Sequence, residues 1–151
     1  MNFKPHPGAP PHLTFCKEMK TSATLQDDAK RFMERHRWKE AMPILREAIL
    51  VSPHDPWNVM YLGSCFYELR EYSNALRCFQ RAEQLDPMNS TPLGLQADAT
   101  HSLGDAATAK RLYERALDLN PEDELAIKNW NRYTKIEEAE QAGDGDAEEA
   151  V

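Results

Sequence analysis

The sequence predicts an all-α fold, an α-solenoid of three helix-turn-helix repeats followed by a C-terminal capping helix. Prolines recur every 34 residues, at Pro53, Pro87 and Pro121, and each follows a short segment containing a leucine that would end a helix. Two columns of alanine and one column of large apolar residues recur with the same period. A fixed period of this length is typical of stacked repeats. The columns are Ala41, Ala75 and Ala109; Ala48, Ala82 and Ala116; and Leu45, Phe79 and Tyr113.

Each repeated residue type has a physical reason. A proline ends a helix because it has no N–H and forces the preceding residue out of the α region. Alanine at every repeat indicates that two helices approach too closely for a larger side chain, and the bulky residue fills the adjacent gap. The sequence therefore predicts helices over 22–35, 39–51, 56–69, 73–85, 90–103, 107–119 and 123–140.

These elements divide the chain into four parts. Residues 1–21 form a proline-rich arm expected to be flexible, and three repeats occupy 22–121, approximately as 22–55, 56–89 and 90–123. A capping helix at 122–140 presents an apolar face to the last repeat. Residues 141–151 are expected to be a disordered acidic tail.

The charge distribution narrows the class of partner. The formal net charge is −7, and the seven acidic side chains of residues 137–151 account for all of it. The remaining residues are formally neutral and show no basic stripe, so nucleic acid is not an expected partner. No apolar run is long enough for a membrane helix, and the segment 1–20 lacks the apolar core of a secretory signal. Three cysteines without paired spacing favour a reducing, cytoplasmic location.

The motifs that mark catalytic and cofactor sites are missing from the sequence. It contains no zinc-protease, phosphate-loop or serine-hydrolase motif, and its five histidines are scattered through the chain. The acidic pairs at 27–28 and 122–123 are better explained as helix-start residues than as acid–base pairs. We therefore expect no enzyme activity, no cofactor and no metal.

The repeating pattern resembles the tetratricopeptide repeat (TPR), whose period is about 34 residues. The resemblance covers roughly 22–121 and is strongest in the second unit, which carries Leu62-Gly63 and then Phe66 before its alanine columns. It implies a superhelix whose concave side, lined by the first helix of each unit, binds a peptide or an unfolded segment of a protein client. The implied groove residues are Lys30, Met33, Trp57, Met60, Tyr61, Ser64, Tyr67, Asp98 and His101.

Three alternatives limit this interpretation. The arm at 12–20, with Leu13, Phe15 and Met19, would cover the groove if it folded back, and Trp57 could pack on the turn before it. A structural scaffold in a multiprotein assembly would instead use the convex face or the capping helix. The carboxylate clamp of TPR domains that bind heat-shock proteins is not expected, since only one of the matching positions is cationic. Those positions are Gln26, Lys30, Tyr61, Thr91 and Leu95.

A narrower resemblance rests on the stretch 61–66, Pro92 and the turn at 103–105. It is similar to the class II chaperones of type III secretion, which hold a short extended segment of a translocator protein in the groove. The resemblance implies pockets formed by Met33, Trp57, Met60 and Tyr67. It also implies a homodimer formed through the N-terminal region, where this chain has a shorter arm that is richer in proline.

Overall fold

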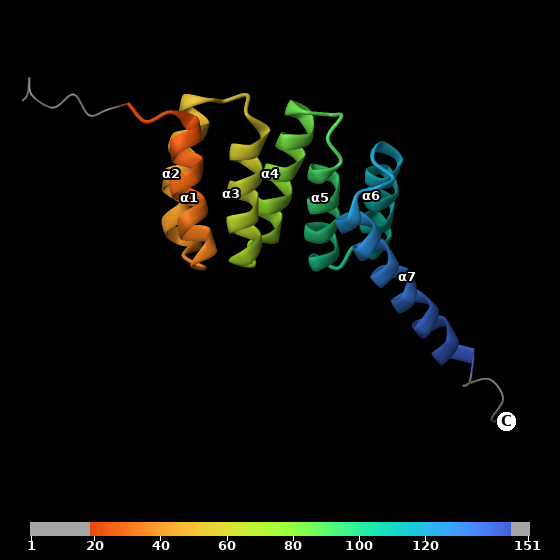
Figure 1. Ribbon diagram of the computed structural model, residues 1–151. Helices are drawn as coiled ribbons and strands as arrows, with labels where there is room; N and C mark the ends of the chain where they lie inside the picture. Colours follow the sequence, from red (N-terminus) through yellow and green to blue (C-terminus); the bar gives the residue numbers. More distant parts are fainter. Residues whose placement is uncertain (1–18, 146–151) are drawn as a thin grey trace, which may run out of the picture.

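The computed structural model describes residues 19–145, which form seven helices and no strands. Six helices stand side by side in pairs, and the seventh leaves the row obliquely (Figure 1). This confirms the predicted all-α solenoid. The helices are α1 (Ser22–Glu34), α2 (Trp38–Val51), α3 (Pro56–Glu68), α4 (Tyr72–Leu85), α5 (Thr91–Ser102), α6 (Ala106–Leu119) and α7 (Glu124–Gly145).

The first helix of each later pair, and α7, begins at a carboxylate or amide cap that recurs once in each repeat. Asp55 accepts a hydrogen bond from Trp57 N at 3.0 Å. Asn89 and Asp123 do the same for the backbone N–H groups two residues further on. Because the first N–H groups of a helix have no partner within it, these side chains fix where α3, α5 and α7 begin.

The turn inside each repeat is also periodic. His36, Arg70 and Gly104 occupy the same repeat position and all have positive φ, at 56°, 62° and 92°. In each case this residue and the next donate backbone hydrogen bonds to carbonyl groups in the last turn of the preceding helix. This is the helix-ending arrangement that glycine favours, so His36 and Arg70 hold it at some cost in backbone strain.

The core lies along the seam between the two helices of each pair. All six column alanines are completely buried, and Leu45, Phe79 and Tyr113 are at most 2% exposed. The approach is very close at Gly63, where an added Cβ would lie 2.6 Å from Phe79 Cε1 and 2.9 Å from Cys78 Cβ. Glycine is required there because α3 and α4 leave no room for a side chain.

A buried polar cluster joins the first two units. Asn58 is completely buried and donates to Ser22 Oγ at 2.9 Å and to the Ala48 carbonyl at 3.2 Å. Its Oδ1 accepts a bond at 2.8 Å from Gln26 Nε2, which also donates to Asp55 at 2.7 Å. Since a buried amide is costly when unpaired, these bonds fix the position of α1 against α3.

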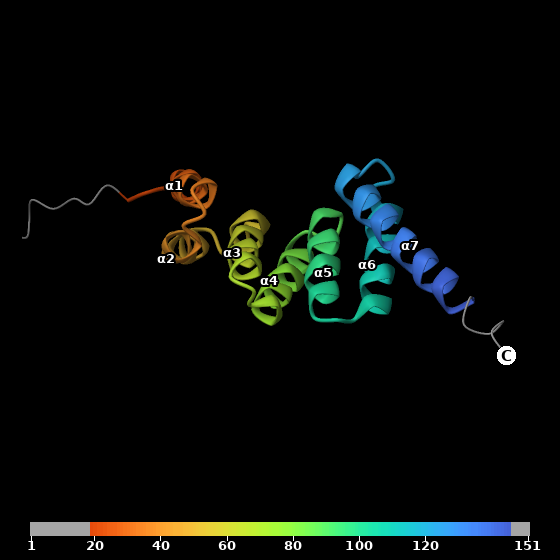
Figure 2. The same ribbon diagram turned by 90° about the horizontal axis from the view of Figure 1, so that it is seen from below.

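The row of helices has two unlike sides. With the row turned about its length, α1 lies above α2 and α3 lies above α4, so the first helix of each of these pairs is offset toward the same side (Figure 2). Each of α2, α4 and α6 packs against the helix before it, and α2 and α4 also pack against the first helix of the next pair. The inner side of the solenoid is thus lined by α1, α3, α5 and α7, as the repeat predicts.

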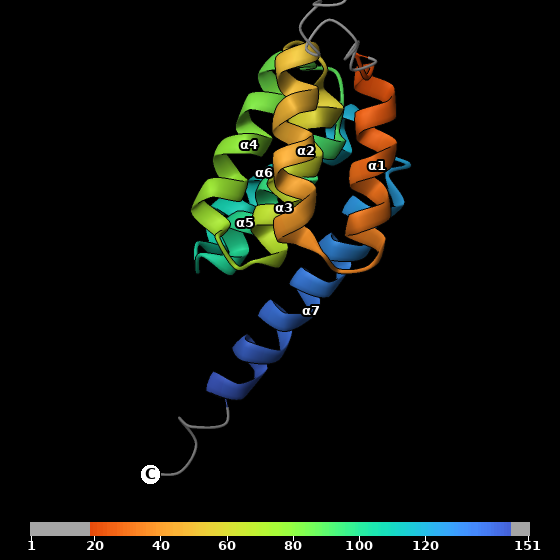
Figure 3. The ribbon, with the colours of Figure 1, turned by 90° about the vertical axis from the view of Figure 1, so that its left-hand side faces the viewer.

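The last helix differs from the one expected. The sequence predicts an end near position 140, but α7 runs to Gly145 and extends past the ends of the other helices (Figure 3). Ala126 and Tyr133 are buried against the repeats, whereas Leu125 and Ile136 are 49% and 44% exposed. Neither α7 nor any other helix in the described part of the chain is long and apolar enough to cross a membrane.

Two of the three cysteines lie within the described residues, and both belong to the core. Cys65 is completely buried and Cys78 is half-buried. Burial raises the pKa of each thiol to about 11, so both remain protonated at neutral pH. They pack as small apolar groups.

The contact at Gly63 gives a prediction with a matched control. Gly63→Ala forces a methyl group into Phe79 and Cys78, and we expect it to lower the free energy of unfolding by about 1–3 kcal/mol. Gly94→Ala in α5 places the same methyl where no atom lies within 4 Å, so it should raise that free energy by about 0.5–1 kcal/mol. Urea denaturation of both variants measures the two effects; equal effects would contradict the close approach of α3 and α4.

Candidate functional site

The inner side of the solenoid carries a row of polar side chains at one repeat position. Lys30 on α1, Ser64 on α3 and Asp98 on α5 are each one repeat apart, and Arg132 on α7 continues the row. The side chain at this position differs from unit to unit, whereas the alanine columns stay constant. The row therefore marks the candidate binding surface of the solenoid.

An aromatic cluster with one cation occupies the α1 end of this surface. The Lys30 ammonium lies 5.1 Å from the centre of the Tyr61 ring, within the range of a cation–π interaction. The ring centres of Tyr61 and Trp57 are 6.0 Å apart, and Trp57 is 46% exposed. Trp57 therefore lies beside Tyr61 and offers a large apolar surface to solvent.

The middle of the surface is formed by the second half of α3. Ser64 Oγ donates to the Met60 carbonyl at 3.0 Å, so its hydroxyl is already bonded within the helix. The half-buried Tyr67 packs edge-on against Tyr72, with ring centres 5.2 Å apart, and its hydroxyl lies 3.2 Å from Ser102 Oγ. Tyr67 thus bridges α3 to α4 and α5.

Asp98 is the main charged group of the α5 end. Its Oδ1 accepts hydrogen bonds from the Tyr113 hydroxyl and, at 3.0 Å, from Asn129 Nδ2. Burial raises the pKa of the Asp98 carboxyl above its usual value, although the bond from Tyr113 and the charges of His101 and Arg132 act in the opposite direction. Burial, together with the carboxyl, also raises the pKa of Tyr113.

His101 lies at the α7 end of the surface. Its ring lies edge-on to Tyr133, with centres 5.0 Å apart. His101 and Arg132 are both exposed and border a hollow of about 250 Å³ that also contains Asp98 and Asn129. This end is therefore polar and carries both signs of charge.

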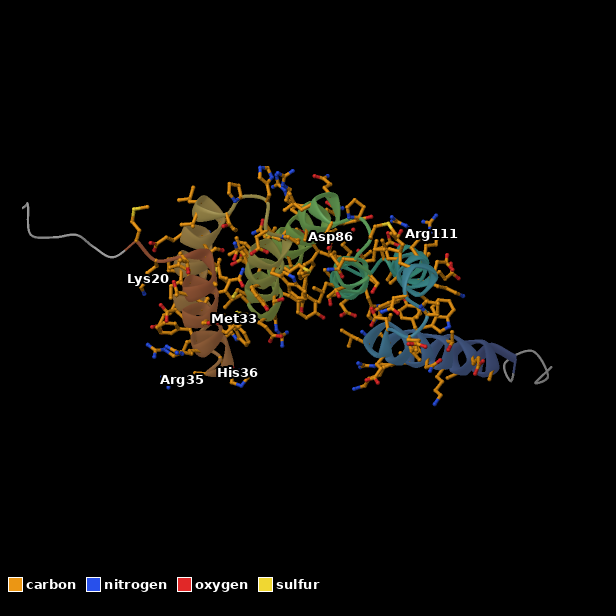
Figure 4. The ribbon with its side chains drawn as sticks, turned by 45° about the horizontal axis from the view of Figure 1, so that its top comes forward. Lys20, Met33, Arg35, His36, Asp86 and Arg111 are labelled. Atoms are coloured by element: carbon orange, nitrogen blue, oxygen red, sulfur yellow. The ribbon has the colours of Figure 1, made fainter. Side chains whose placement is uncertain are left out.

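Two of the predicted groove residues lie elsewhere. Met60 is only 2% exposed and belongs to a core cluster with Val59, Ala82 and the partly buried Leu95, so the prediction that it lines the groove is wrong. An unbranched thioether chain is flexible enough to fill such a seam. Met33, on the side of α1 that faces α3 (Figure 4), is half-buried against the core of the first unit. The groove is therefore less apolar than predicted.

Three further residues belong to the candidate site, although the sequence interpretation assigns them only to the core or to the capping helix. Tyr113 belongs to the predicted core, yet its hydroxyl binds Asp98, and Asn129 and Arg132 come from the capping helix. For Arg132 a signal is present, because it stands one repeat length after Asp98. For Asn129 the repeat pattern offers no comparable signal, since its role depends on how α7 packs.

The predicted cover of the groove by the N-terminal arm falls mostly outside the described residues. Leu13 and Phe15 belong to residues 1–18, which the structure does not describe. Met19 is described and is 95% exposed, so this residue covers no part of the groove. The alternative position for Trp57, on the turn before α3, stays a prediction; its ring centre lies 6.0 Å from that of Tyr61.

A larger hollow, of about 720 Å³, lies on the side of α4 and α6. Its floor contains Gln96 and Thr100, which stand where the second unit has Leu62 and Phe66. Gln96 is satisfied by a 2.7 Å bond to Glu83, and Glu83 also pairs with Arg115 at 2.7 Å. Smaller polar residues thus leave the third unit underfilled on this side.

Comparison with known proteins identifies the repeats. Residues 59–89 and 93–123 each match a sequence model described as "Tetratricopeptide repeat". These are the second and third of the three units. With seven helices and no strands in the described part, the fold is an all-α TPR solenoid.

Two curated relatives share this sequence pattern over part of their length. Anaphase-promoting complex subunit 3 of Schizosaccharomyces pombe is 30% identical over 77 residues, which is 51% of this chain and 12% of that protein. BBSome complex member BBS4 of Xenopus tropicalis is 30% identical over 100 residues, which is 66% of this chain and 19% of that protein. The chain thus spans less than a fifth of either relative.

Solved structures share the arrangement of the helices. The first TPR domain of Spaghetti (RPAP3), solved with the HSP90 peptide SRMEEVD, has a TM-score of 0.71 over 79% of this chain and 94% of that one. The two sequences are 18% identical, so the likeness concerns the fold. It shows that the row of helices seen here is a known TPR arrangement.

The burial of Asp98 predicts a pH dependence of stability. Because the folded-state pKa is raised, the folded chain binds more protons than the unfolded chain, and stability is lost as pH rises through that pKa. Asp98→Asn keeps an acceptor for Tyr113 and Asn129 and removes the charge. We expect this variant to unfold at a higher urea concentration than the unmodified chain at pH 7, with the gap closing toward pH 4.

Asp105 provides a control of opposite sign. Hydrogen bonds from Thr108 lower the pKa of this exposed helix cap, so its contribution is present at neutral pH and lost as the pH falls through the folded-state value. At pH 7 the Asp105→Asn variant should therefore unfold at a urea concentration no higher than that of the unmodified chain. If the Asp98→Asn gap instead widened on acidification, the burial of Asp98 would not be the cause.

Proposed function

We propose that this chain is a protein-interaction module that binds an extended peptide segment on the concave side of its TPR solenoid. The observation that carries the proposal is the exposed Trp57 beside Tyr61 and Lys30 on the inner side of α1 and α3. Partly exposed aromatic rings in a concavity are typical of binding hot spots. The TPR domain of Spaghetti, which has the same fold, was solved with a bound peptide.

The groove does not favour a peptide held by its terminal carboxylate. Of the positions that match the clamp of heat-shock-binding TPR domains, Gln26 is committed to Asp55 and Asn58, and Leu95 packs in the core. Lys30 supplies the one cation among them, and it lies over Tyr61. We therefore infer that the ligand is an internal segment of a protein, recognised by its side chains.

The secretion-chaperone role is a narrower form of the same proposal. It requires apolar side chains of the client to enter successive pockets along the groove. Trp57 is 46% exposed and Tyr67 borders a hollow, whereas Met60 is buried and Met33 packs against the core of the first unit. A client with two apolar anchors, rather than four, is the version that fits this surface.

The second candidate function is a scaffold that binds through its outer side. Both curated relatives are named as members of multiprotein complexes, and a hollow lies between α4 and α6. The two functions can be separated by surface variants, because the hollow is lined by Leu76, Leu103 and Leu112, which lie outside the groove. Leu103 is 47% exposed, so partner binding that is lost on Leu103→Arg and kept on Trp57→Ala favours the scaffold.

The groove proposal predicts a loss of binding without a loss of stability. Trp57→Ala should weaken binding of peptides selected against the full chain by about 30-fold or more, since hot-spot truncations cost about 2 kcal/mol or more. The same change should lower the free energy of unfolding by less than about 1 kcal/mol, because much of the ring is exposed. Fluorescence anisotropy and urea denaturation measure the two quantities.

Leu50→Ala is the matched control for this experiment. Leu50 lies on α2, is 82% exposed and is remote from the inner side of α3, so its truncation should leave binding unchanged. Tyr67→Ala should weaken binding but also cost some stability, because its ring packs on Tyr72. Unfolding of both the Trp57 and Tyr67 variants would show that these residues are core and would refute the groove.

A further inference from the structure

One hollow on the inner side combines an apolar floor with acidic walls. It has a volume of about 190 Å³ and lies where the second half of α3 meets α5. At about 30 Å³ for each water, it has room for about six waters, or for one long side chain in their place. Its lining residues are Ser64, Tyr67, Glu68, Phe79, Leu95 and Asp98.

The lining is suited to an aliphatic stem. The half-buried Leu95 provides apolar surface at the base, above the buried Phe79, and Tyr67 provides an aromatic wall. Tyr67 is held in place by its edge-on contact with Tyr72 and by the contact of its hydroxyl with Ser102. Long charged side chains bury such stems readily while their charged ends remain polar, and guanidinium groups also stack on aromatic rings.

The charges that border the hollow are of one sign. Glu68 is exposed at its rim and Asp98 is half-buried in its wall, and no basic residue lines it. Both hydrogen bonds that the Asp98 carboxyl accepts within the described residues go to Oδ1, which leaves Oδ2 for a ligand. His101 and Arg132 border the adjoining hollow on the α7 side and form no ion pair with Asp98 among the described residues.

We propose that this hollow binds a lysine or arginine side chain of the peptide segment. Its aliphatic stem lies on Leu95 and Tyr67, and its cationic group pairs with Glu68 and Asp98. A cation brought to a half-buried carboxylate restores the favourable interactions that desolvation removes. This inference rests on the proposed peptide-binding function and specifies the chemistry of the ligand.

The geometry of α3 also predicts the spacing within the ligand. Trp57 and Tyr67 are ten positions apart on one helix, which at about 1.5 Å per residue is about 15 Å. An extended peptide advances about 3.3 Å per residue. The basic residue should therefore lie about four or five positions from the apolar residue that contacts Trp57.

The test is a selection of random dodecapeptides displayed on phage against the full chain. We expect the enriched peptides to share a lysine or arginine at that spacing from an aromatic or aliphatic residue. Replacing the basic residue by glutamine in a synthetic peptide should weaken binding about tenfold or more on the unmodified chain. On the Glu68→Gln, Asp98→Asn double variant the same replacement should have little effect.

Two further variants make the result specific. Glu114→Gln removes one negative charge from an exposed position on α6 and should leave binding unchanged, which separates the pocket from the overall charge. Glu68→Gln alone changes an exposed residue, so it tests the pocket even if the double variant does not fold. Circular dichroism and a thermal melt verify the fold of each variant.

The possible failures are distinguishable. This inference is overturned if the enriched peptides depend on Trp57 but carry no basic residue. It is also overturned if replacing the basic residue by glutamine weakens binding equally on the unmodified chain and on the Glu68→Gln variant. Either result leaves the peptide-binding function standing. A selection that yields no peptide dependent on Trp57 overturns both.

Discussion

The close approach of the two helices within each repeat is the constraint on which the rest of this structure depends. At Gly63 the backbone of α3 lies so near Phe79 and Cys78 that no side chain fits, and elsewhere the helices pack on the completely buried alanine columns. Close approach fixes which faces of the helices are consumed by packing. Side chains on the inner face of α1, α3, α5 and α7 lie outside this close contact and are freer to vary, although Asp98 still accepts hydrogen bonds from Tyr113 and Asn129.

That freedom explains why one repeat position carries four different side chains. Lys30, Ser64, Asp98 and Arg132 are equivalent in the repeat yet present a cation, a hydroxyl, a carboxylate and another cation. The groove is therefore not uniform: its α1 end is aromatic and cationic, and its α5 end is acidic in the wall and mixed in charge toward α7. A solenoid keeps the backbone spacing of these groups regular while their chemistry varies, which suits recognition of an extended segment.

The helices can be predicted from the sequence because their ends are fixed by local signals. Prolines, caps and the alanine period place the ends of the first six helices to within one residue, whereas α7 has no such signal at its end and runs to Gly145. The groove is harder to predict. The burial of Met60 depends on the seam beside Leu95 of another helix, and the role of Asn129 depends on how α7 packs. The local sequence pattern predicts neither contact, because each forms only when separate helices pack together.

The third unit shows how stability and recognition are linked in such a scaffold. α5 is buried on most of its surface, and yet it carries Asp98, whose carboxyl is raised in pKa by burial and forms no ion pair among the described residues. A carboxylate in this condition weakens the folded state, because its lost hydration is only partly replaced by Tyr113 and Asn129. The same deficit is what makes a cationic ligand favourable, since the ligand supplies the missing interaction. The middle unit, with its close packing at Gly63, supports a neighbouring unit that keeps a destabilising carboxylate.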